Sequence, residues 1–122
     1  MSHLRSQATQ ICTIADRRLD AIVAPSTPSA GAAFLRSGLT VLAPELSELR
    51  GLQAPGDSAT VYQAAITAFS RELSSIRHTV RALGEGLDPG IAMRDLRHRL
   101  VPLESTQAGA WQALQVPACV AS

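Results

Sequence analysis

The chain has 122 residues, of which 46% are hydrophobic, yet only four side chains are aromatic. Its apolar residues are mostly alanine (20) and leucine (15), which favour helices, and the shortage of β-branched and aromatic side chains argues against an all-β fold. A formal net charge of +1 provides no field to attract a polyanion, so nucleic acid is not expected as a partner.

The spacing of the apolar side chains predicts four amphipathic helices, of which the first two cover residues 4–24 and 29–50. The first helix carries small and aliphatic side chains at helical spacing, which would let a neighbouring helix approach closely. Thr27-Pro28 precedes the second helix and offers a capping residue followed by a proline at the first helical position. Leucines separated by four and three residues follow it, as expected for one buried face.

The third helix is predicted over residues 57–83 and the fourth over residues 89–115. The third has the clearest pattern, because seven apolar residues from Tyr62 to Leu83 lie alternately four and three positions apart. The fourth begins after Asp88-Pro89, which repeats the signal for a helix start.

Glycines and short connections define how these helices must be arranged. Gly51 and Gly84 each follow the end of an apolar repeat, and we expect both to adopt the left-handed conformation that ends a helix. Connections of about four to six residues cannot carry the chain back along a helix about 30 Å long, so successive helices must be antiparallel. The sequence therefore predicts an all-α fold, a single domain over residues 1–122 that forms an antiparallel up-down-up-down four-helix bundle.

The two cysteines are far apart in sequence but lie at the same end of the predicted bundle. Cys12 is two turns into the first helix, and Cys119 follows the fourth. We therefore predict a disulfide between them, which would close nearly the whole chain and contribute about 4 to 5 kcal/mol by the chain-entropy treatment. The alternative is a pair of unrelated reduced thiols in a cytosolic protein.

A disulfide of this kind implies export to an oxidising compartment. No secretory leader precedes the first helix, so we expect that a leader has been removed and that the protein is extracytoplasmic, either secreted or at the cell surface. The sequence predicts no transmembrane segment, because two prolines and a glycine interrupt its long uncharged stretch, residues 21–35. Membrane attachment would then be possible only through the missing leader.

Several segments also carry a resemblance to other proteins. They are Cys12, Ala33-Phe34-Leu35, Leu49-Arg50-Gly51-Leu52-Gln53-Ala54-Pro55, Tyr62 and Trp111-Gln112-Ala113-Leu114-Gln115-Val116-Pro117-Ala118-Cys119. Together they resemble a group of small secreted proteins and lipoproteins of actinobacteria. The resemblance implies an extracytoplasmic helical domain with a bridge from Cys12 to Cys119, and it implies no activity. The chain differs from the group in lacking the export leader and its lipidated cysteine.

The sequence contains none of the common motifs for catalysis or cofactor binding. The sequence has no G-x-S-x-G elbow, no phosphate-binding glycine loop and no metal-ligand spacing, so it assigns no catalytic residue, no metal and no cofactor. Two histidines, His78 and His98, are candidates for a haem ligand, although an exposed surface histidine is the commoner role for each.

Two prolines lie inside predicted helices and suggest a place where a ligand could bind. Pro44 and Pro102 each remove a backbone donor and are expected to kink their helices at nearly the same level, on diagonally opposite sides of the bundle. Such kinks would open an apolar groove; the alternative is that both helices bend around a packed core. The residues expected to line this groove are Leu42, Leu46, Leu100, Leu103, Gln107 and Trp111.

These observations together predict a non-enzymatic extracytoplasmic binding or interaction module. Its expected partner is an unidentified protein or a small apolar ligand. One alternative is a carrier of a small molecule or haem that uses the groove between the kinked helices. Another is an enzyme without a recognisable motif.

Overall fold

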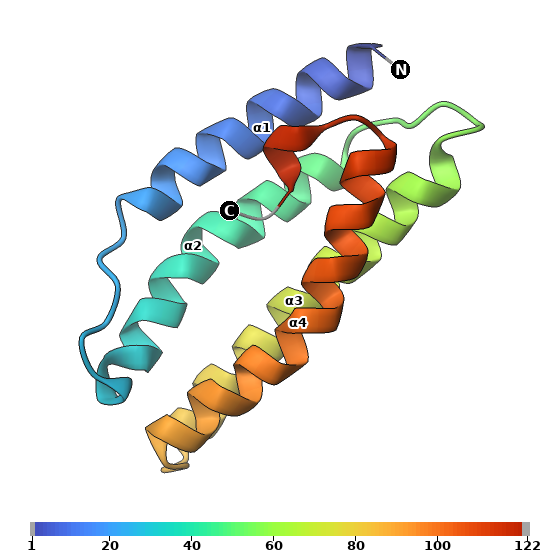
Figure 1. The fold of residues 1–122 in the computed structure, drawn as a ribbon. Helices are drawn as coiled ribbons and strands as arrows, with labels where there is room; N and C mark the ends of the chain where they lie inside the picture. The colour runs from blue at the N-terminus through green and yellow to red at the C-terminus, as the bar shows by residue number, and fades with distance from the viewer. Residues whose placement is uncertain (1, 121–122) are drawn as a thin grey trace.

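The computed structural model describes residues 2–120, which form four α-helices and two short 3-10 helices and contain no strand (Figure 1). The elements are α1 (Ser2–Asp20), η1 (Pro28–Ala30), α2 (Gly31–Arg50), α3 (Ala59–Gly84), α4 (Pro89–Ala113) and η2 (Pro117–Cys119). The predicted all-α class and the antiparallel up-down-up-down order of the helices are confirmed.

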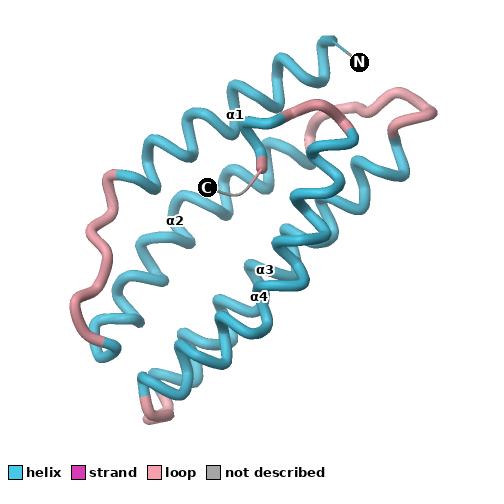
Figure 2. Tube along the Cα trace, viewed as in Figure 1, coloured by secondary structure: helices cyan, strands magenta, loops and turns pink. Residues whose placement is uncertain are grey.

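Neighbouring helices in the sequence pack side by side, but the fourth side of the bundle is built differently. α1 packs against α2, α2 against α3, and α3 against α4, which form the largest interface. α1 has no extended contact with α4; instead η2 contacts both helices and bridges part of the gap between them. Figure 2 shows the loops that join the helices at alternate ends of the bundle.

The hydrophobic core lies along the inner face of α3, as its apolar repeat predicts. Tyr62, Ile66, Phe69, Leu73 and Ile76 are all buried there. From α4, the fully buried ring of Trp111 packs edge-to-face against Tyr62, with 5.8 Å between the ring centroids. The Tyr62 hydroxyl donates a hydrogen bond to the carbonyl of Leu49 on α2, so this pair of rings ties three helices together.

Two of the predicted helix starts differ in how they are capped. Asp88 caps α4 as predicted, because its Oδ2 accepts a hydrogen bond of 3.1 Å from the Ile91 amide. Thr27 caps no backbone amide, and its hydroxyl contacts that of Ser29 at 3.0 Å. The chain first forms the 3-10 turn Pro28–Ala30, so α2 begins at Gly31, two residues later than predicted.

The predicted end of the first helix was wrong by one turn. α1 ends at Asp20 instead of residue 24. Pro25 explains part of the difference, because a proline disfavours the helical conformation of the residue before it. The predicted last turn, residues 21–24, also has little to bury, because the Val23 side chain is 86% exposed. Packing therefore adds no stability to a helix that continues past Asp20.

Both predictions of left-handed glycines were also wrong. Gly51 is right-handed, with φ −74°, and its amide still bonds back to the carbonyls of Ser47 and Glu48. Gly84 lies within α3, and the left-handed residue is Gly86, with φ +95°, which lets the Leu87 amide reach back to the Ala82 carbonyl at 3.0 Å. At the end of α4, Gln115 adopts φ +61° although it is not a glycine.

The two internal prolines lie within unbroken helical segments. Pro44 is inside α2 and Pro102 inside α4, and both rings are exposed to solvent. Each helix continues past its proline, and kinks at these positions stay a prediction. None of the described helices is long and apolar enough to cross a membrane.

Candidate functional site

A cavity of about 130 Å³ lies between the helices and the C-terminal segment. Every helix contributes to its wall, as does the C-terminal segment. The lining residues are Cys12, Asp16, Leu19, Leu42, Glu45, Leu49, Phe69, Glu72, Gln107, Ala118, Cys119 and Val120. Three acidic residues therefore line a cavity whose other walls are largely apolar.

The helical repeat places two of these carboxylates on the inner side of the bundle. Glu45 lies three residues after Leu42 and four before Leu49, so it shares their face of α2 and is only 8% exposed. On α3, Glu72 lies three residues after Phe69, also toward the cavity, and it is half-buried. Asp16 is half-buried on α1, one turn after the bridged Cys12.

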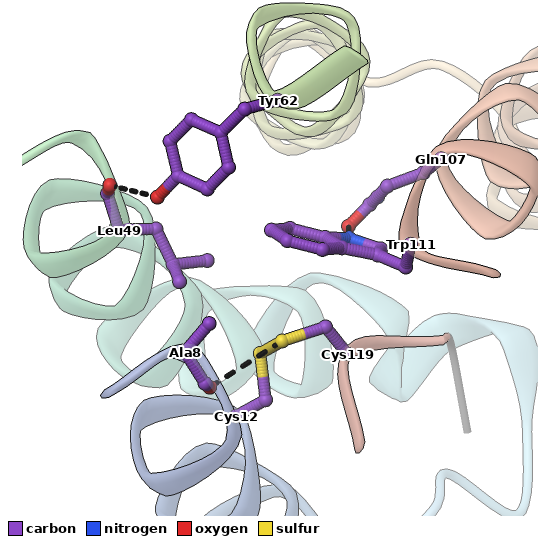
Figure 3. Close-up of a disulfide and its surroundings, with 7 residues drawn as sticks. All are labelled: Ala8, Cys12, Leu49, Tyr62, Gln107, Trp111 and Cys119. Atoms are coloured by element: carbon purple, nitrogen blue, oxygen red, sulfur yellow. Dashed lines mark hydrogen bonds between the residues drawn. A yellow bond between two sulfur atoms is a disulfide. The ribbon is translucent and has the colours of Figure 1, made fainter. Parts of the chain in front are cut away.

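A hydrogen-bonded chain from the core holds Glu72. The indole Nε1 of Trp111 donates to Oε1 of Gln107 at 3.0 Å, and Nε2 of Gln107 donates to Oε1 of Glu72 at 2.9 Å. Figure 3 shows the Gln107 amide lying against the edge of the indole ring. Because the indole nitrogen can only donate, it fixes the amide so that its NH2 group faces the carboxylate.

Glu45 has no comparable support. Among residues 2–120, no group donates a hydrogen bond to its carboxylate and no cation forms an ion pair with it, although 92% of its surface is buried. The Glu45 oxygens keep some contact with solvent, because no fully buried side-chain oxygen or nitrogen of the described residues lacks a hydrogen-bond partner. Burial of the rest of the side chain nevertheless disfavours the charged form. Glu45 therefore differs from Glu72, which lines the same cavity but receives a hydrogen bond.

Burial and mutual repulsion raise the pKa values of all three acids. Burial raises the pKa of Glu45 to about 8, and the nearby charges of Asp16, Glu48 and Glu72 add to the effect. For Glu72, burial raises the pKa to about 7 despite the opposing hydrogen bond from Gln107. The pKa of Asp16 is also raised, first by burial and then by Asp20. Near neutral pH the cavity can therefore gain or lose protons.

The predicted disulfide between Cys12 and Cys119 is present and forms part of the cavity wall. The two Cα atoms are 5.2 Å apart, and the bridge joins α1 to η2 (Figure 3). Sγ of Cys119 lies 3.4 Å from the carbonyl oxygen of Ala8, a packing contact, since an oxidised sulfur carries no hydrogen to donate. Nearby, Nε of Arg5 donates to the Leu114 carbonyl at 3.0 Å, so the end of α4 is tied to α1 as well.

The structure does not gather the six predicted groove residues in one place. Leu42 and Gln107 line the acidic cavity, whereas Leu46 and Trp111 are buried in the core. Leu100 is half-buried against the core, and Leu103 lines a wide, open depression of about 690 Å³ on the outer side of α3 and α4.

The two haem-ligand candidates lie outside this cavity. His78 on α3 and His98 on α4 are both exposed, and neither is among the residues that line it. No group of three or more His, Cys, Asp or Glu residues in the described part of the chain is arranged to hold a metal ion.

The patterns described for the sequence do not predict Asp16, Glu45 or Glu72 as site residues, although the sequence carries a signal for two of them. Glu45 and Glu72 share one spacing: each lies three residues after one seam residue and directly before the next. For Glu45 these are Leu42 and Leu46. Such positions flank the apolar seam and become buried when a neighbouring segment covers them. An acid there can therefore be recognised as a candidate for burial.

Comparison with known proteins adds no relative to this description. No protein-family model, curated protein or solved structure matches the chain significantly.

Proposed function

We propose that the protein is a non-enzymatic, extracytoplasmic binding module and that its ligand site is the acidic cavity beside the Cys12–Cys119 disulfide. The observation that carries this proposal is the carboxylate of Glu45, which is 8% exposed and has no hydrogen-bond donor or counter-ion among residues 2–120. A glutamine or leucine at this position would avoid the cost of an unpaired buried charge. A ligand that donates a hydrogen bond to the Glu45 carboxylate would explain why a glutamate stands at this position.

The composition of the wall supports binding over catalysis. Asp16, Glu45 and Glu72 offer acceptor oxygens, and Gln107 is already engaged on both sides of its amide. The lining residues include no hydroxyl or thiol nucleophile beside a base, which a covalent mechanism would need. The arrangement is suited to holding a ligand in a fixed position.

Two observations support an extracytoplasmic location. A disulfide that closes 107 positions of the chain persists in oxidising compartments and is rare in the cytosol. The resemblance to secreted proteins and lipoproteins of actinobacteria points the same way. The state of the two thiols in protein isolated from its native cells tests this part, because two free thiols would contradict it.

A thermal-shift experiment tests the binding proposal. Small amines, alcohols and carboxylates of about four to seven non-hydrogen atoms are each titrated into the protein, because a ligand of the folded state raises Tm with concentration. The Ala118→Leu variant adds bulk to the cavity wall, and Ala113→Leu on the exposed end of α4 is its matched control. We expect one chemical class to stabilise the wild type and the A113L variant but not A118L. Equal responses of all three proteins to every compound would contradict the proposal.

A further inference from the structure

We infer that the ligand of this cavity is a small aliphatic ammonium ion, of the size of a short alkylamine or diamine, held by Glu45 and Glu72. This inference rests on the proposed function and names the chemistry of its ligand. Three properties of the cavity lead to it: the sign of its charge, the kind of hydrogen-bonding group that it offers, and its volume.

The charge of the cavity is of one sign. Its wall carries Asp16, Glu45 and Glu72, and the further acids Glu48 and Glu104 lie close enough to raise the pKa values of Glu45 and Glu72, respectively. The chain has 11 arginines, yet none of them and no histidine lines this cavity. Acids of α1, α2 and α3 therefore surround Glu45 in the described residues. Arg18 of α1 lines a separate small cleft beside Glu45 and Glu48 and does not line the acidic cavity.

The free hydrogen-bonding positions are acceptors. Neither oxygen of Glu45 accepts a hydrogen bond from the described residues, and both keep some contact with solvent, so a ligand can reach them. Glu72 has one oxygen engaged by Gln107, which leaves the other available. The oxygen of Gln107 already accepts from Trp111. An ammonium group carries three donors and no acceptor, so it complements this set of oxygens. An anion or a carbonyl compound would place acceptors against acceptors.

The remaining wall favours an organic cation over a metal ion. Leu19, Leu42, Leu49 and Phe69 provide apolar surface for a hydrocarbon chain, and an aromatic ring also attracts ammonium groups over its face. Hard metal ions need about six oxygen ligands, and the described residues form no cluster of this kind. The volume of about 130 Å³ corresponds to roughly four water molecules, which suits about four to seven non-hydrogen atoms.

Binding of an ammonium ion should be linked to the release of protons. The cation stabilises ionised carboxylates, whereas in the free protein burial raises the pKa of Glu45 to about 8 and of Glu72 to about 7. Affinity should therefore rise as the pH increases from 6 to 8, up to about tenfold per pH unit for each proton displaced. The ligand keeps its own charge over this interval, because alkylamines titrate near pH 10, as lysine does.

The test is calorimetric titration of the whole protein with 1,4-diaminobutane and 1-aminobutane at pH 6 and pH 8 in 150 mM salt. The uncharged analogue 1,4-butanediol and the dianion succinate have similar size and serve as controls. We expect one amine to bind per chain, at least tenfold more tightly than the diol, and more tightly at pH 8. E45Q and E72Q should each weaken amine binding at least tenfold, whereas E85Q, at an exposed position after α3, should change it less than twofold.

The outcomes separate the inference from the proposed function. Tight binding of the diol or of succinate would overturn the ammonium inference and leave the binding module intact. Failure of every compound, with A118L and wild type alike in the thermal-shift panel, would overturn both. Amine binding that E45Q retains, or that appears only at low ionic strength, would mark a surface effect and overturn the inference. E45Q removes a largely buried carboxyl, so we expect the variant to remain folded. Circular dichroism checks that weaker binding by E45Q is not caused by unfolding.

Discussion

Replacing Glu45 by glutamine should stabilise the protein at pH 8 and leave its stability at pH 5 nearly unchanged. Burial raises the pKa of Glu45 from 4.5 to about 8 in the folded protein. A carboxyl whose pKa is raised by folding contributes stability below its unfolded pKa, and this contribution is lost as the pH rises toward the folded value. Glutamine has nearly the same shape and never ionises, so the variant avoids that loss.

The size of the effect follows from the same pKa values. Each pH unit between the unfolded and folded pKa costs about 1.4 kcal/mol, which gives an upper limit of about 5 kcal/mol between pH 4.5 and pH 8. Water that enters the cavity and small side-chain movements reduce this cost, so we expect a stabilisation of about 2 kcal/mol at pH 8. At pH 5 the wild-type side chain is already neutral, and the difference should be less than about 0.5 kcal/mol, the usual range for a neutral exchange.

The assay is urea unfolding followed by circular dichroism at pH 5 and at pH 8, for wild type, E45Q and E48Q. Glu48 lies on the same helix but is exposed, so E48Q controls for the loss of a negative charge as such. The same stability change for E45Q at both pH values, or a loss of stability at pH 8, would refute the reasoning. It would mean that the Glu45 carboxyl is well solvated in the folded protein.

Three further changes have effects that the structure fixes. Q115G should raise the free energy of unfolding by about 1 kcal/mol in urea titrations, because Gln115 holds φ +61°, where glycine has no Cβ penalty; an unchanged stability would show that the end of α4 relaxes in solution. Reduction of the Cys12–Cys119 bridge should lower the free energy of unfolding by about 4 kcal/mol, measured with and without reductant. A loss below about 1 kcal/mol would contradict the view that the bridge stabilises the fold by restricting a long loop in the unfolded chain. Q107L should cost about 1 to 3 kcal/mol and shift the fluorescence of Trp111, whose indole N–H loses its partner; equal stability would mean that water replaces the amide.

The fold could be predicted from the sequence because its information is local and repeated. The seven apolar positions of α3 and the capping Asp88 each specify a helix or its start without reference to the rest of the chain. Short connections then leave one arrangement of neighbours. The ends of helices are harder to predict from the sequence. Gly84 and Gly86 are two residues apart, and the sequence does not show that Gly86 is the one with the left-handed conformation.

The candidate site could be predicted only in part, for a different reason. Leu42 and Gln107 were recognised because they lie on apolar faces, and the disulfide because the topology brings its ends together. Glu45 and Glu72 were missed because a charged side chain beside an apolar seam normally lies in solvent. The cavity that they line is completed by residues 118–120 of the C-terminal segment, and no local pattern reports the path of such a segment.

The bridge between the first helix and the last turn also sets the order in which the protein can mature. A four-residue turn joins α3 to α4, so the contacts nearest the turn are local and can form early, on the fast timescale of helical structure. Cys12 must wait for Cys119, which is synthesised 107 residues later, and disulfide formation itself takes seconds to hours. Until the bridge closes, it does not hold the C-terminal segment against α1, and Ala118 and Val120 of that segment form part of the cavity wall. The 122 residues contain two cysteines, so their pairing with each other has a single arrangement, and that arrangement joins the first helix to the last turn of the fold.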